Sequence, residues 1–404
     1  MTKRVILHVG TPKTGTSYVQ DVLFRNRRAL ALAGIHYPAD RFDAHFLAAL
    51  DLMRLPWGGL EHEAVGAWDR LAAEVRGKRG TSIISHEILA TASRSQVGRA
   101  LESLGHGDGT EVHVVLSVRD LVRQIPAEWQ ENVKHRSTIT YARFLRQLQD
   151  PARDTRISSW FWGVQEVPDI LNRWGLDLPP ERVHVVTVPA PGGPKELLWE
   201  RFSHALGLEG LHLDLEAERS NPSLGVPETA LLRRINKSAN DVVEPAHYRP
   251  LVRELLAHQT LSRRTGSPRL ALPADVHAWA REVSASWRTE VERRGYHVVG
   301  DLADLLGRPD PGPWTDPDRP PEKQVAGAAV DAIRALLLEN ARLRGREGHL
   351  ASELHETQVA LERSYLRPTY RWREKLVRRL QSGSYGRSLL NAYRRARGRS
   401  SRAA

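Results

Sequence analysis

The sequence predicts an α/β protein, a three-layer sandwich of helices around a mainly parallel β-sheet, followed by a C-terminal helical extension. Through roughly the first 310 of the 404 residues, short apolar runs alternate with longer amphipathic stretches, as in strands joined by crossover helices. Hydrophobic residues make up 41% of the chain, which is enough to fill a sizeable core. A proline-rich segment then separates this body from a long helical pattern.

Four apolar runs bounded by charged or turn residues predict buried strands, at residues 5–9, 82–85, 112–117 and 183–188. A glycine-containing loop follows the first run, and the pattern after it predicts one helix over 17–33. In such sheets, ligands bind beyond the carboxyl ends of the strands. The residues that follow these runs are therefore the first candidates for a functional site.

The predicted organisation has four parts: an α/β domain over 1–307, a linker over 308–321, a long helix over 322–365 and a basic tail over 366–404. The linker has six prolines in fourteen residues. In the helix, leucines recur every seven residues, at 336, 343 and 350, although Asn340 and Glu347 interrupt the seam. Two interpretations remain open. Either the helix forms a coiled coil with a second copy of the chain, or it packs its apolar stripe on the body.

The net charge of +11 belongs entirely to the tail. Residues 366–404 contain eleven arginines and one lysine against one acidic residue, Glu374. Subtracting these from the 59 basic and 48 acidic residues of the chain leaves 47 of each in the body. Trp372, Leu376 and Leu380 lie on one helical face among the cations, which favours a helix at an anionic membrane surface. A basic tail with no dedicated partner is the alternative; no base-reading motif supports a specific nucleic-acid partner.

Several classes of protein are excluded by composition. The chain has no cysteine, which rules out disulfides, thiolate nucleophiles and Cys-ligated zinc. Its apolar runs are far shorter than the roughly 18 residues that a membrane-spanning helix needs. Only Val5-Ile6-Leu7 follows the basic pair near the N-terminus, so no signal peptide is predicted. We expect a cytoplasmic protein, with peripheral contact to the inner face of the membrane if the tail binds lipid.

The strongest local motif follows the first predicted strand and reads Gly10-Thr-Pro-Lys-Thr-Gly-Thr-Ser17. Gly10 and Gly15 have the spacing of a nucleotide-binding P-loop, in which backbone N–H groups and a helix dipole hold a phosphate. The nucleotide-hydrolysing pattern requires Gly-Lys-Ser/Thr at its end, whereas this chain has Gly15-Thr16-Ser17 and carries its lysine inside the loop, as Lys13.

This motif resembles the 5′-phosphosulfate-binding loop of sulfotransferases that use 3′-phosphoadenylyl sulfate (PAPS), and order and spacing extend the resemblance over residues 4–305. The resemblance implies a fold similar to nucleotide kinases, with PAPS as co-substrate and no metal. It implies further that Lys13 neutralises the sulfuryl group and the departing phosphate oxygen. The residues implied in cofactor binding at this loop are Pro12, Lys13, Thr14, Gly15, Thr16 and Ser17.

A second segment, Val114 to Asp120, resembles the family's 3′-phosphate-binding strand, which ends in an arginine, here Arg119. The family usually adds a serine eight residues later, where this chain has Ala127. Arg123, one helical turn after Arg119, is a possible substitute. Asn221 and Ser223 occupy a loop where many family members bring polar groups to the nucleotide; alternatively, they cap the next helix.

Sulfuryl transfer needs a base near the acceptor, and family bases are His or Glu. The candidates are Glu87 and His45, with His86 third. His86 and Glu87 directly follow a predicted strand, and His45 lies after the first helix. No group of histidines and carboxylates has metal-ligand spacing.

Three functions remain in view. The first is transfer of a sulfuryl group from PAPS to a glycan, lipid-linked or small-molecule acceptor. The second is a P-loop kinase or NTPase, which the missing Gly-Lys-Ser/Thr disfavours. The third is a non-catalytic assembly protein that keeps the fold and uses its helix and tail, for which Ala127 leaves room.

Overall fold

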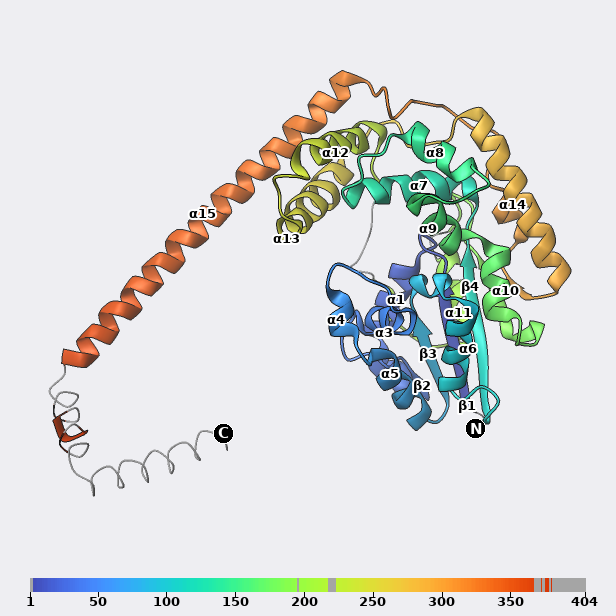
Figure 1. Cartoon of the computed structure of the whole chain (residues 1–404), viewed down its shortest axis with the longest axis horizontal. Helices are drawn as coiled ribbons and strands as arrows, with labels where there is room; N and C mark the ends of the chain where they lie inside the picture. The colour runs from blue at the N-terminus through green and yellow to red at the C-terminus, as the bar shows by residue number, and fades with distance from the viewer. Residues whose placement is uncertain are drawn as a thin grey trace. The chain divides into compact units, whose positions relative to one another are not determined.

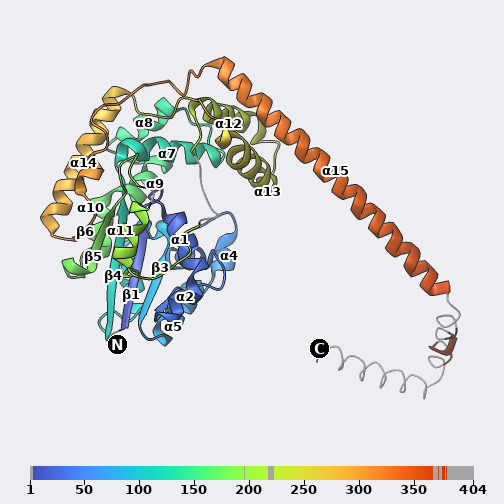
Figure 2. The same ribbon diagram turned by 180° about the vertical axis from the view of Figure 1, so that it is seen from behind.

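The computed structural model describes residues 3–194, 196–216 and 223–366, together with 372, 375–377 and 379. Packing divides the chain into two compact units, one ending at Ala332 and the other beginning at Ile333. Figures 1 and 2 show the first unit from opposite sides, with helices around a central sheet. Asn221 and most of the basic tail lie outside the described residues.

The first unit is built on a six-stranded sheet in which every pair of neighbouring strands is parallel. The strand order is β2-β3-β1-β4-β5-β6. The strands are β1 (Lys3–Gly10), β2 (Ile35–His36), β3 (Thr81–Ser85), β4 (Thr110–Val118), β5 (Val183–Thr187) and β6 (His297–Val299). The predicted α/β fold with a mainly parallel sheet is confirmed. The four predicted strands correspond to β1, β3, β4 and β5, whereas the short β2 and β6 are not predicted.

Helices flank this sheet. They are α1 (Thr16–Arg25), α2 (Arg27–Leu32), α3 (Ala44–Met53), α4 (Leu60–Ala64), α5 (Ala67–Gly77), α6 (Arg94–Ser103), α7 (Leu121–Lys134), α8 (Tyr141–Gln149), α9 (Arg156–Gln165), α10 (Val167–Gly175), α11 (Leu197–Leu206), α12 (Val226–Ala239), α13 (Pro245–Tyr248) and α14 (Ala274–Arg294). Shorter or wider helical turns are η1 (Glu87–Thr91), η2 (Pro180–Arg182), η3 (Arg249–Thr260), η4 (Leu261–Arg263) and η5 (Leu302–Leu306).

Both faces of the central strands are buried. Every residue of β1 from Val5 to Gly10 is buried, and successive side chains of a strand point to opposite faces. On one face, Ile6 of β1 and Val115 of β4 share a core with Val22 of α1 and Phe202 of α11. Parallel strands covered on both faces favour continuous apolar runs over alternating ones, which explains why these strands are visible in the sequence.

The helix predicted over 17–33 is two helices, α1 and α2, which meet at Asn26. The Asn26 amide donates to the carbonyls of Val22 and Asp214, both at 2.8 Å, and the Asp214 N–H donates to the Asn26 side chain at 2.9 Å. These bonds to a distant segment fix the break. The local pattern therefore could not have located it.

The proline-rich segment 308–321 forms no helix or strand, yet it is held on the first unit by Asp318. This carboxylate accepts hydrogen bonds from the N–H groups of Tyr141 (3.0 Å) and Ala142 (2.9 Å), at the start of α8. It also forms an ion pair with Arg233 at 3.2 Å. The segment therefore caps a helix of the first unit in addition to leading to α15 (Glu322–Leu366).

The second unit consists, in its described part, mainly of α15 from Ile333 onward. Within the described residues, no helix combines the length and apolar character needed to cross a lipid bilayer. The amphipathic segment predicted around Trp372 falls largely outside the described residues, so its membrane contact stays a prediction.

Candidate functional site

The segments that the sequence marks as functional follow three adjacent strands. Because β3, β1 and β4 are parallel neighbours, their carboxyl ends lie at one edge of the sheet. The Thr11 N–H donates to the Ser117 carbonyl at 2.8 Å, and the His86 N–H donates to the His8 carbonyl at 3.0 Å. From β1 the chain passes to β2 and β3, on one side of β1 in the strand order, and from β3 it crosses to β4 on the other side. Folds of this kind bind ligands at the point where the strand order reverses.

A buried polar network supports the loop that follows β1. The ring of His8 lies between two hydroxyls, with Nδ1 2.7 Å from Ser85 Oγ and Nε2 3.1 Å from Ser117 Oγ. Ser117 Oγ donates to the Gly10 carbonyl at 2.9 Å and lies 2.6 Å from the Thr14 hydroxyl. Burial lowers the pKa of His8 to about 4, so this ring is neutral at pH 7. The Thr14 side chain thus anchors the loop to Ser117 of β4.

Residues 13–17 of the loop present unbonded backbone N–H donors. The N–H groups of residues 13–17 donate to none of the described residues. Helix α1 begins at Thr16 without a side-chain cap, and Gly15 precedes it with a φ of 91°. Lys13 has a φ of 65°, a left-handed conformation that is uncommon for a residue with a side chain. A row of free N–H groups at a helix N-terminus suits an anion such as phosphate.

Two glycines allow the loop to pack closely against its neighbours. A Cβ on Gly10 would lie 2.9 Å from the Glu87 carbonyl oxygen, and a Cβ on Gly15 would lie 2.6 Å from Leu198 Cδ2. The Pro12 carbonyl accepts hydrogen bonds from two amide side chains, those of Gln124 (2.8 Å) and Gln165 (3.4 Å). The loop is therefore fixed on three sides.

The side chains of the remaining loop residues differ in exposure. Thr16 is buried at the start of α1, whereas Ser17 is exposed. Neither hydroxyl makes a hydrogen bond with the residues that the structure describes. Both could turn toward a ligand at the helix N-terminus.

Lys13 projects toward two carboxylates on α7. Its Nζ lies 2.6 Å from Glu131 Oε2. Glu131 also contacts His135 at 3.1 Å and Arg253, from η3, at 3.5 Å. Burial would raise the pKa of Glu131, but the His135 hydrogen bond and the charges of Lys13 and Lys134 hold that pKa well below its usual range. Glu131 is therefore a permanent negative charge next to the loop.

Glu128 lies one helical turn before Glu131 and is buried, with 6% of its surface exposed. Its carboxylate forms no hydrogen bond or ion pair with a described residue. Burial raises its pKa to about 7; the charge of Lys13 opposes this shift, and that of Glu131 adds to it. A carboxyl group that titrates near neutral pH beside a lysine is a candidate acid or base.

Glu128 and Glu131 are not among the site residues predicted from the sequence. A signal was present, because two carboxylates three residues apart share one face of a helix that starts at a strand end. What the sequence could not provide is the direction of that face. Only the fold places it against Lys13.

The two arginines at the start of α7 are placed differently. Arg119 donates to the Lys13 carbonyl at 3.2 Å, while its Nε is buried without a partner among the described residues. Burial lowers the pKa of Arg119 to about 10, with the charge of Arg123 adding to the shift. Arg123 bonds to Asp120, to the Pro189 carbonyl (2.9 Å) and to the Val188 carbonyl (3.3 Å). Arg119 thus has a donor for a ligand, whereas Arg123 ties α7 to the end of β5.

Glu87 begins η1, directly after His86. Its Oε2 accepts from the Gln20 amide at 2.9 Å. Burial would raise the pKa of Glu87, but the charge of His86 and the Gln20 bond bring it below the usual value. His86 Nδ1 accepts from the Ile88 N–H at 3.3 Å, and burial lowers the pKa of His86.

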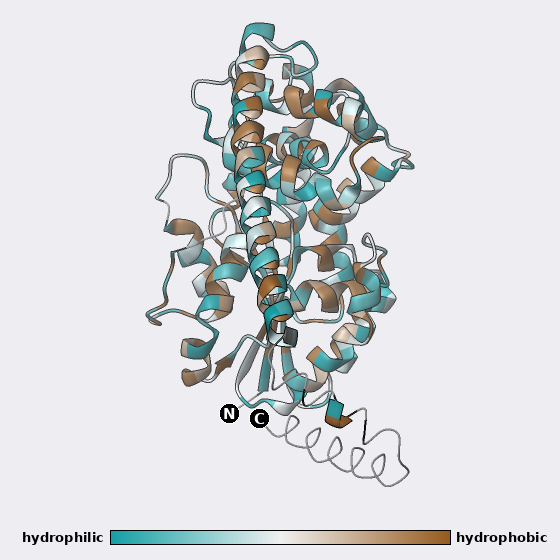
Figure 3. Ribbon diagram, turned by 90° about the vertical axis from the view of Figure 1, so that its left-hand side faces the viewer, coloured by the Kyte–Doolittle hydropathy of each residue, from teal (hydrophilic) through white to brown (hydrophobic). Residues whose placement is uncertain are grey.

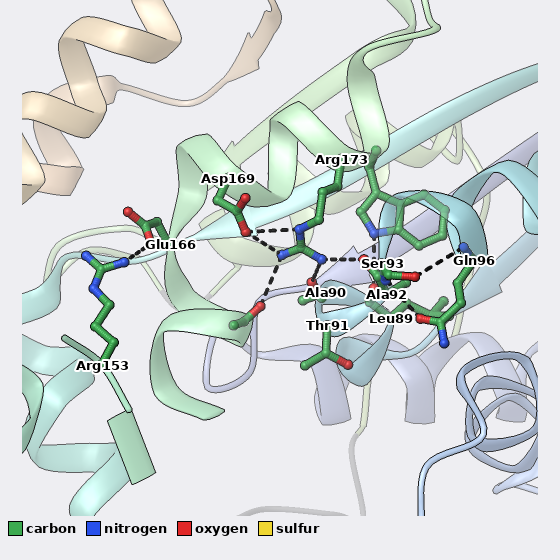
Figure 4. A network of polar contacts seen from close by, with 12 residues as sticks. Leu89, Ala90, Thr91, Ala92, Ser93, Gln96, Arg153, Glu166, Asp169 and Arg173 are labelled. Atoms are coloured by element: carbon green, nitrogen blue, oxygen red, sulfur yellow. Dashed lines mark hydrogen bonds and ion pairs between the residues drawn. The ribbon is translucent and has the colours of Figure 1, made fainter. Parts of the chain in front are cut away.

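Figure 4 shows how η1 is held in place. Arg173 of α10 donates to the carbonyl of Ala90 at 2.7 Å and also to that of Ala92. The Trp174 indole donates to the Leu89 carbonyl at 3.0 Å. Three backbone carbonyls within residues 89–92 are therefore bonded to α10, which holds η1 and Glu87 in position.

His45 and Ser223 lie in different surroundings. His45 is buried, its Nε2–H donates to the Pro38 carbonyl at 3.0 Å, and its Nδ1 accepts from the Ser85 N–H at 3.3 Å. Both ring nitrogens are thus used within the protein, and burial lowers the pKa of His45 to about 4. Ser223 is exposed, and Ala127 provides no hydroxyl on α7.

In the part of the chain that the structure describes, no group of three or more His, Asp or Glu side chains is arranged to hold a metal ion. Comparisons with protein-family models, with curated proteins and with solved structures find no match for this chain. A functional assignment therefore has to be based on the geometry of the loop and of the helices around it.

Proposed function

We propose that this chain transfers a sulfuryl group from PAPS to a hydroxyl or amine of an acceptor, which is a glycan, a lipid-linked molecule or a small metabolite. The observation that supports this most is the row of free N–H groups at residues 13–17, with Lys13 inside the loop. A 5′-phosphate held by such a row would bring its sulfuryl group next to the lysine.

The position of the lysine favours sulfuryl transfer over nucleotide hydrolysis. A kinase or NTPase uses a lysine after the second glycine to hold the β- and γ-phosphates, and a following hydroxyl to hold Mg²⁺. Here Lys13 precedes Gly15, and its ammonium group pairs with Glu131 of α7. A single charged group beyond the 5′-phosphate suits this arrangement better than a triphosphate.

Arg119 is the candidate ligand of the 3′-phosphate. Its buried Nε without a partner is a costly group to leave unpaired, and a phosphate oxygen would satisfy it. Arg123 would support it indirectly by fixing the start of α7. Because Ala127 supplies no hydroxyl, the 3′-phosphate would depend on Arg119 more than in the family pattern.

The reaction requires one charge for the leaving group and one base for the acceptor. The acceptor oxygen or nitrogen attacks sulfur, the bond from sulfur to the phosphate oxygen breaks, and the electron pair leaves with that oxygen, where Lys13 balances the charge. The acceptor proton passes to a carboxylate. Glu128, buried beside Lys13 with a pKa of about 7, fits this role better than Glu87, whose pKa is lowered.

Calorimetry with 3′,5′-ADP, the product of the donor, tests the proposal directly. We expect micromolar binding without Mg²⁺, at least 100-fold weaker binding of 5′-ADP, and no Mg²⁺-dependent turnover of ATP. The two ADP isomers differ in where the second phosphate is attached, at the 3′ or the 5′ position, so the comparison tests whether the site has a place for a 3′-phosphate, for which Arg119 is the candidate ligand. Tight binding and hydrolysis of Mg²⁺–ATP would support the kinase alternative, and binding of neither nucleotide would support a non-catalytic role.

The acceptor can be sought with labelled PAPS against glycan, lipid and metabolite fractions. The assay should compare the full chain with a chain ending at residue 365. If the basic tail brings the enzyme to a membrane, only transfer to lipid-borne acceptors should fall on truncation. Equal activity of both chains on every fraction would argue against a membrane role for the tail.

A further inference from the structure

Helix α15 changes character along its length. In its first turns, Val325, Ala328 and Ala332 are buried, each with at most 4% of its surface exposed, and Glu322 pairs with Arg234 at 2.6 Å. From Ile333 to Leu361, the leucines are exposed. The exposed fractions are 40% for Leu336, 45% for Leu343, 53% for Leu350, 60% for Leu354 and 52% for Leu361.

These five leucines are separated by seven, seven, four and seven residues, which places them on one stripe of the helix; Leu337 and Leu338, exposed at 65% and 67%, lie beside it. Taking Leu336, Leu343 and Leu350 as d positions of a heptad repeat places Ile333, Leu354 and Leu361 at a positions. Figure 3 shows apolar and polar turns alternating along α15. A repeat of 3.5 residues keeps such a stripe on one side only if the helix supercoils with another helix.

The helix has reason to need a partner. Gly345 and Gly348 each cost a helix about 1 kcal/mol relative to alanine. A Cβ at either glycine would meet no atom within 4 Å, so neither is required by packing. Both fall on the side of the helix away from the stripe, at f and b positions. A long exposed helix with two such residues gains little from propensity alone, so association along the stripe is the available source of stability.

We infer that α15 forms a parallel, in-register two-stranded coiled coil with a second copy of this chain. The polar residues of the stripe determine the orientation. Asn340 and Glu347 both occupy a positions, and in a parallel pair each a residue meets its own counterpart. Asn340 would then hydrogen-bond the partner's Asn340, which is the best attested use of a buried polar residue in fixing two strands in register.

Antiparallel pairing fits Asn340 poorly. It sets a positions against d positions, so the Asn340 amide would face a leucine and lose its hydrogen bonds.

The flanking charges are complementary in the parallel arrangement. Glu347 at a faces the partner's Glu347, and Arg346 at the preceding g position of each strand lies beside this carboxylate pair and offsets its repulsion. Glu339 at g and Arg344 at the following e position form a second pair between the strands. Within one chain Glu339 bonds to Arg342 at 2.7 Å, an exposed pair that association could replace at little cost. A second copy therefore suits this surface in charge as well as in apolar pattern.

The absence of cysteine from the chain allows a direct test in the full-length protein. Asn340→Cys places one thiol at an a position, and Ser352→Cys places one at an f position on the outer side of the helix. Under mild oxidation we expect the first variant to become almost completely disulfide-linked, and the second at least tenfold less. Equal linkage of both variants would overturn the proposal. A dimer in which Asn340→Cys does not link would overturn the parallel register.

The mass in solution provides the second measurement. Light scattering should give twice the chain mass for the full-length protein and the single-chain mass for Leu343→Asp/Leu350→Asp. A monomeric full-length protein would overturn the proposal. The double variant should bind 3′,5′-ADP as the parent chain does, and circular dichroism should show a folded first unit. The masses and linkages are measured without nucleotide, so they hold or fail independently of the proposed sulfuryl transfer.

Discussion

The two halves of the loop after β1 differ in how their polar groups are used. In the held half, the hydroxyl of Thr14 and the N–H of Thr11 are bonded to Ser117, and Ser117 is bonded in turn to His8. In the open half, the N–H groups of residues 13–17 have no hydrogen-bond partner among the described residues. The difference shows how a protein can keep backbone donors available for a ligand. The unpaired N–H groups are destabilising, and the hydrogen bonds of the held half keep the loop in place despite them.

The same contrast extends to the charged side chains around the loop. Arg123 has its donors bonded within the protein and holds α7 in place. Arg119 keeps a buried Nε without a partner, and Glu128, with 6% of its surface exposed, forms no side-chain hydrogen bond or ion pair with a described residue. An arginine nitrogen buried without a partner, next to a loop with unbonded N–H groups, favours a ligand site at this position. Substitutions in each half should therefore have separable effects.

The largest effect is expected for Lys13→Ala in the open half. Removing the charge beside the leaving oxygen should lower transfer by about 10³-fold while the protein stays folded. Lys3→Ala is the matched control, since Lys3 is a lysine of β1 whose side chain donates to the Arg76 carbonyl at 2.7 Å. The measurement is transfer from labelled PAPS, with thermal unfolding of both variants. Equal losses in the two variants would contradict a special role for Lys13.

Glu128→Gln should have the next largest effect, about 10²-fold on transfer. With a pKa of about 7, the base is deprotonated only above that pH, so the rate of the parent chain should fall as pH drops below 7. Glu128→Gln should remove this limb of the profile. If Glu87→Gln removes the limb and Glu128→Gln leaves it, the base is Glu87.

The same variant has a signature that does not depend on activity. The native state holds the Glu128 proton up to about pH 7, whereas the unfolded chain releases it near 4.5. The ionised carboxyl group therefore costs stability that is fully present above pH 7 and vanishes below about 4.5. Glu128→Gln should be more stable than the parent chain at pH 8, by up to about 3 kcal/mol, and equally stable at pH 4. Chemical unfolding at the two pH values measures this difference.

Gly15→Ala should weaken 3′,5′-ADP binding by about tenfold or more, because the new Cβ would lie 2.6 Å from Leu198 Cδ2 and displace the loop. Gly34→Ala is a matched control, since Gly34 has a φ of 75° and open space around its Cα. Both variants should lose about 1 kcal/mol of stability from backbone strain, and only Gly15→Ala should lose affinity. Calorimetry on both variants separates the two contributions.

The smallest effect on function is expected in the held half. Ser117→Ala removes a hydroxyl that bonds the Gly10 carbonyl and faces His8 and Thr14, so the free energy of unfolding should fall by about 2 kcal/mol. Ser286→Ala, whose exposed hydroxyl donates to its own helix, should change stability by less than about 0.5 kcal/mol. Affinity of the folded Ser117→Ala protein for 3′,5′-ADP should stay within about tenfold of the parent. A larger loss of affinity without loss of stability would make Ser117 a ligand.

The sequence predicts well those elements in which consecutive residues are all buried. The strands β1 and β4 are covered on both faces, so they appear as apolar runs, and the glycines of the loop are required by its conformation. β2 and β6, with two and three residues, are too short to leave a pattern. The loop could therefore be found from the sequence, together with the arginine that follows β4.

The missed parts depend on contacts between distant residues. The break at Asn26 is fixed by its bonds to Asp214. The position of Glu131 against Lys13 depends on how α7 is rotated over the sheet, which no local pattern encodes. For the same reason His45, attractive as a histidine near a strand end, has both nitrogens bonded in the interior.

The ion pair between Lys13 and Glu131 gives the loop a resident counterion. A ligand must displace this carboxylate before it can use the lysine, so a weak monoanion at millimolar concentration has little to gain there. An anion with several charges can compete, because it also meets the free N–H groups and Arg119. Screening by salt weakens the resident pair together with the incoming one. Nucleotide affinity should therefore depend on ionic strength less steeply than the number of its charges suggests.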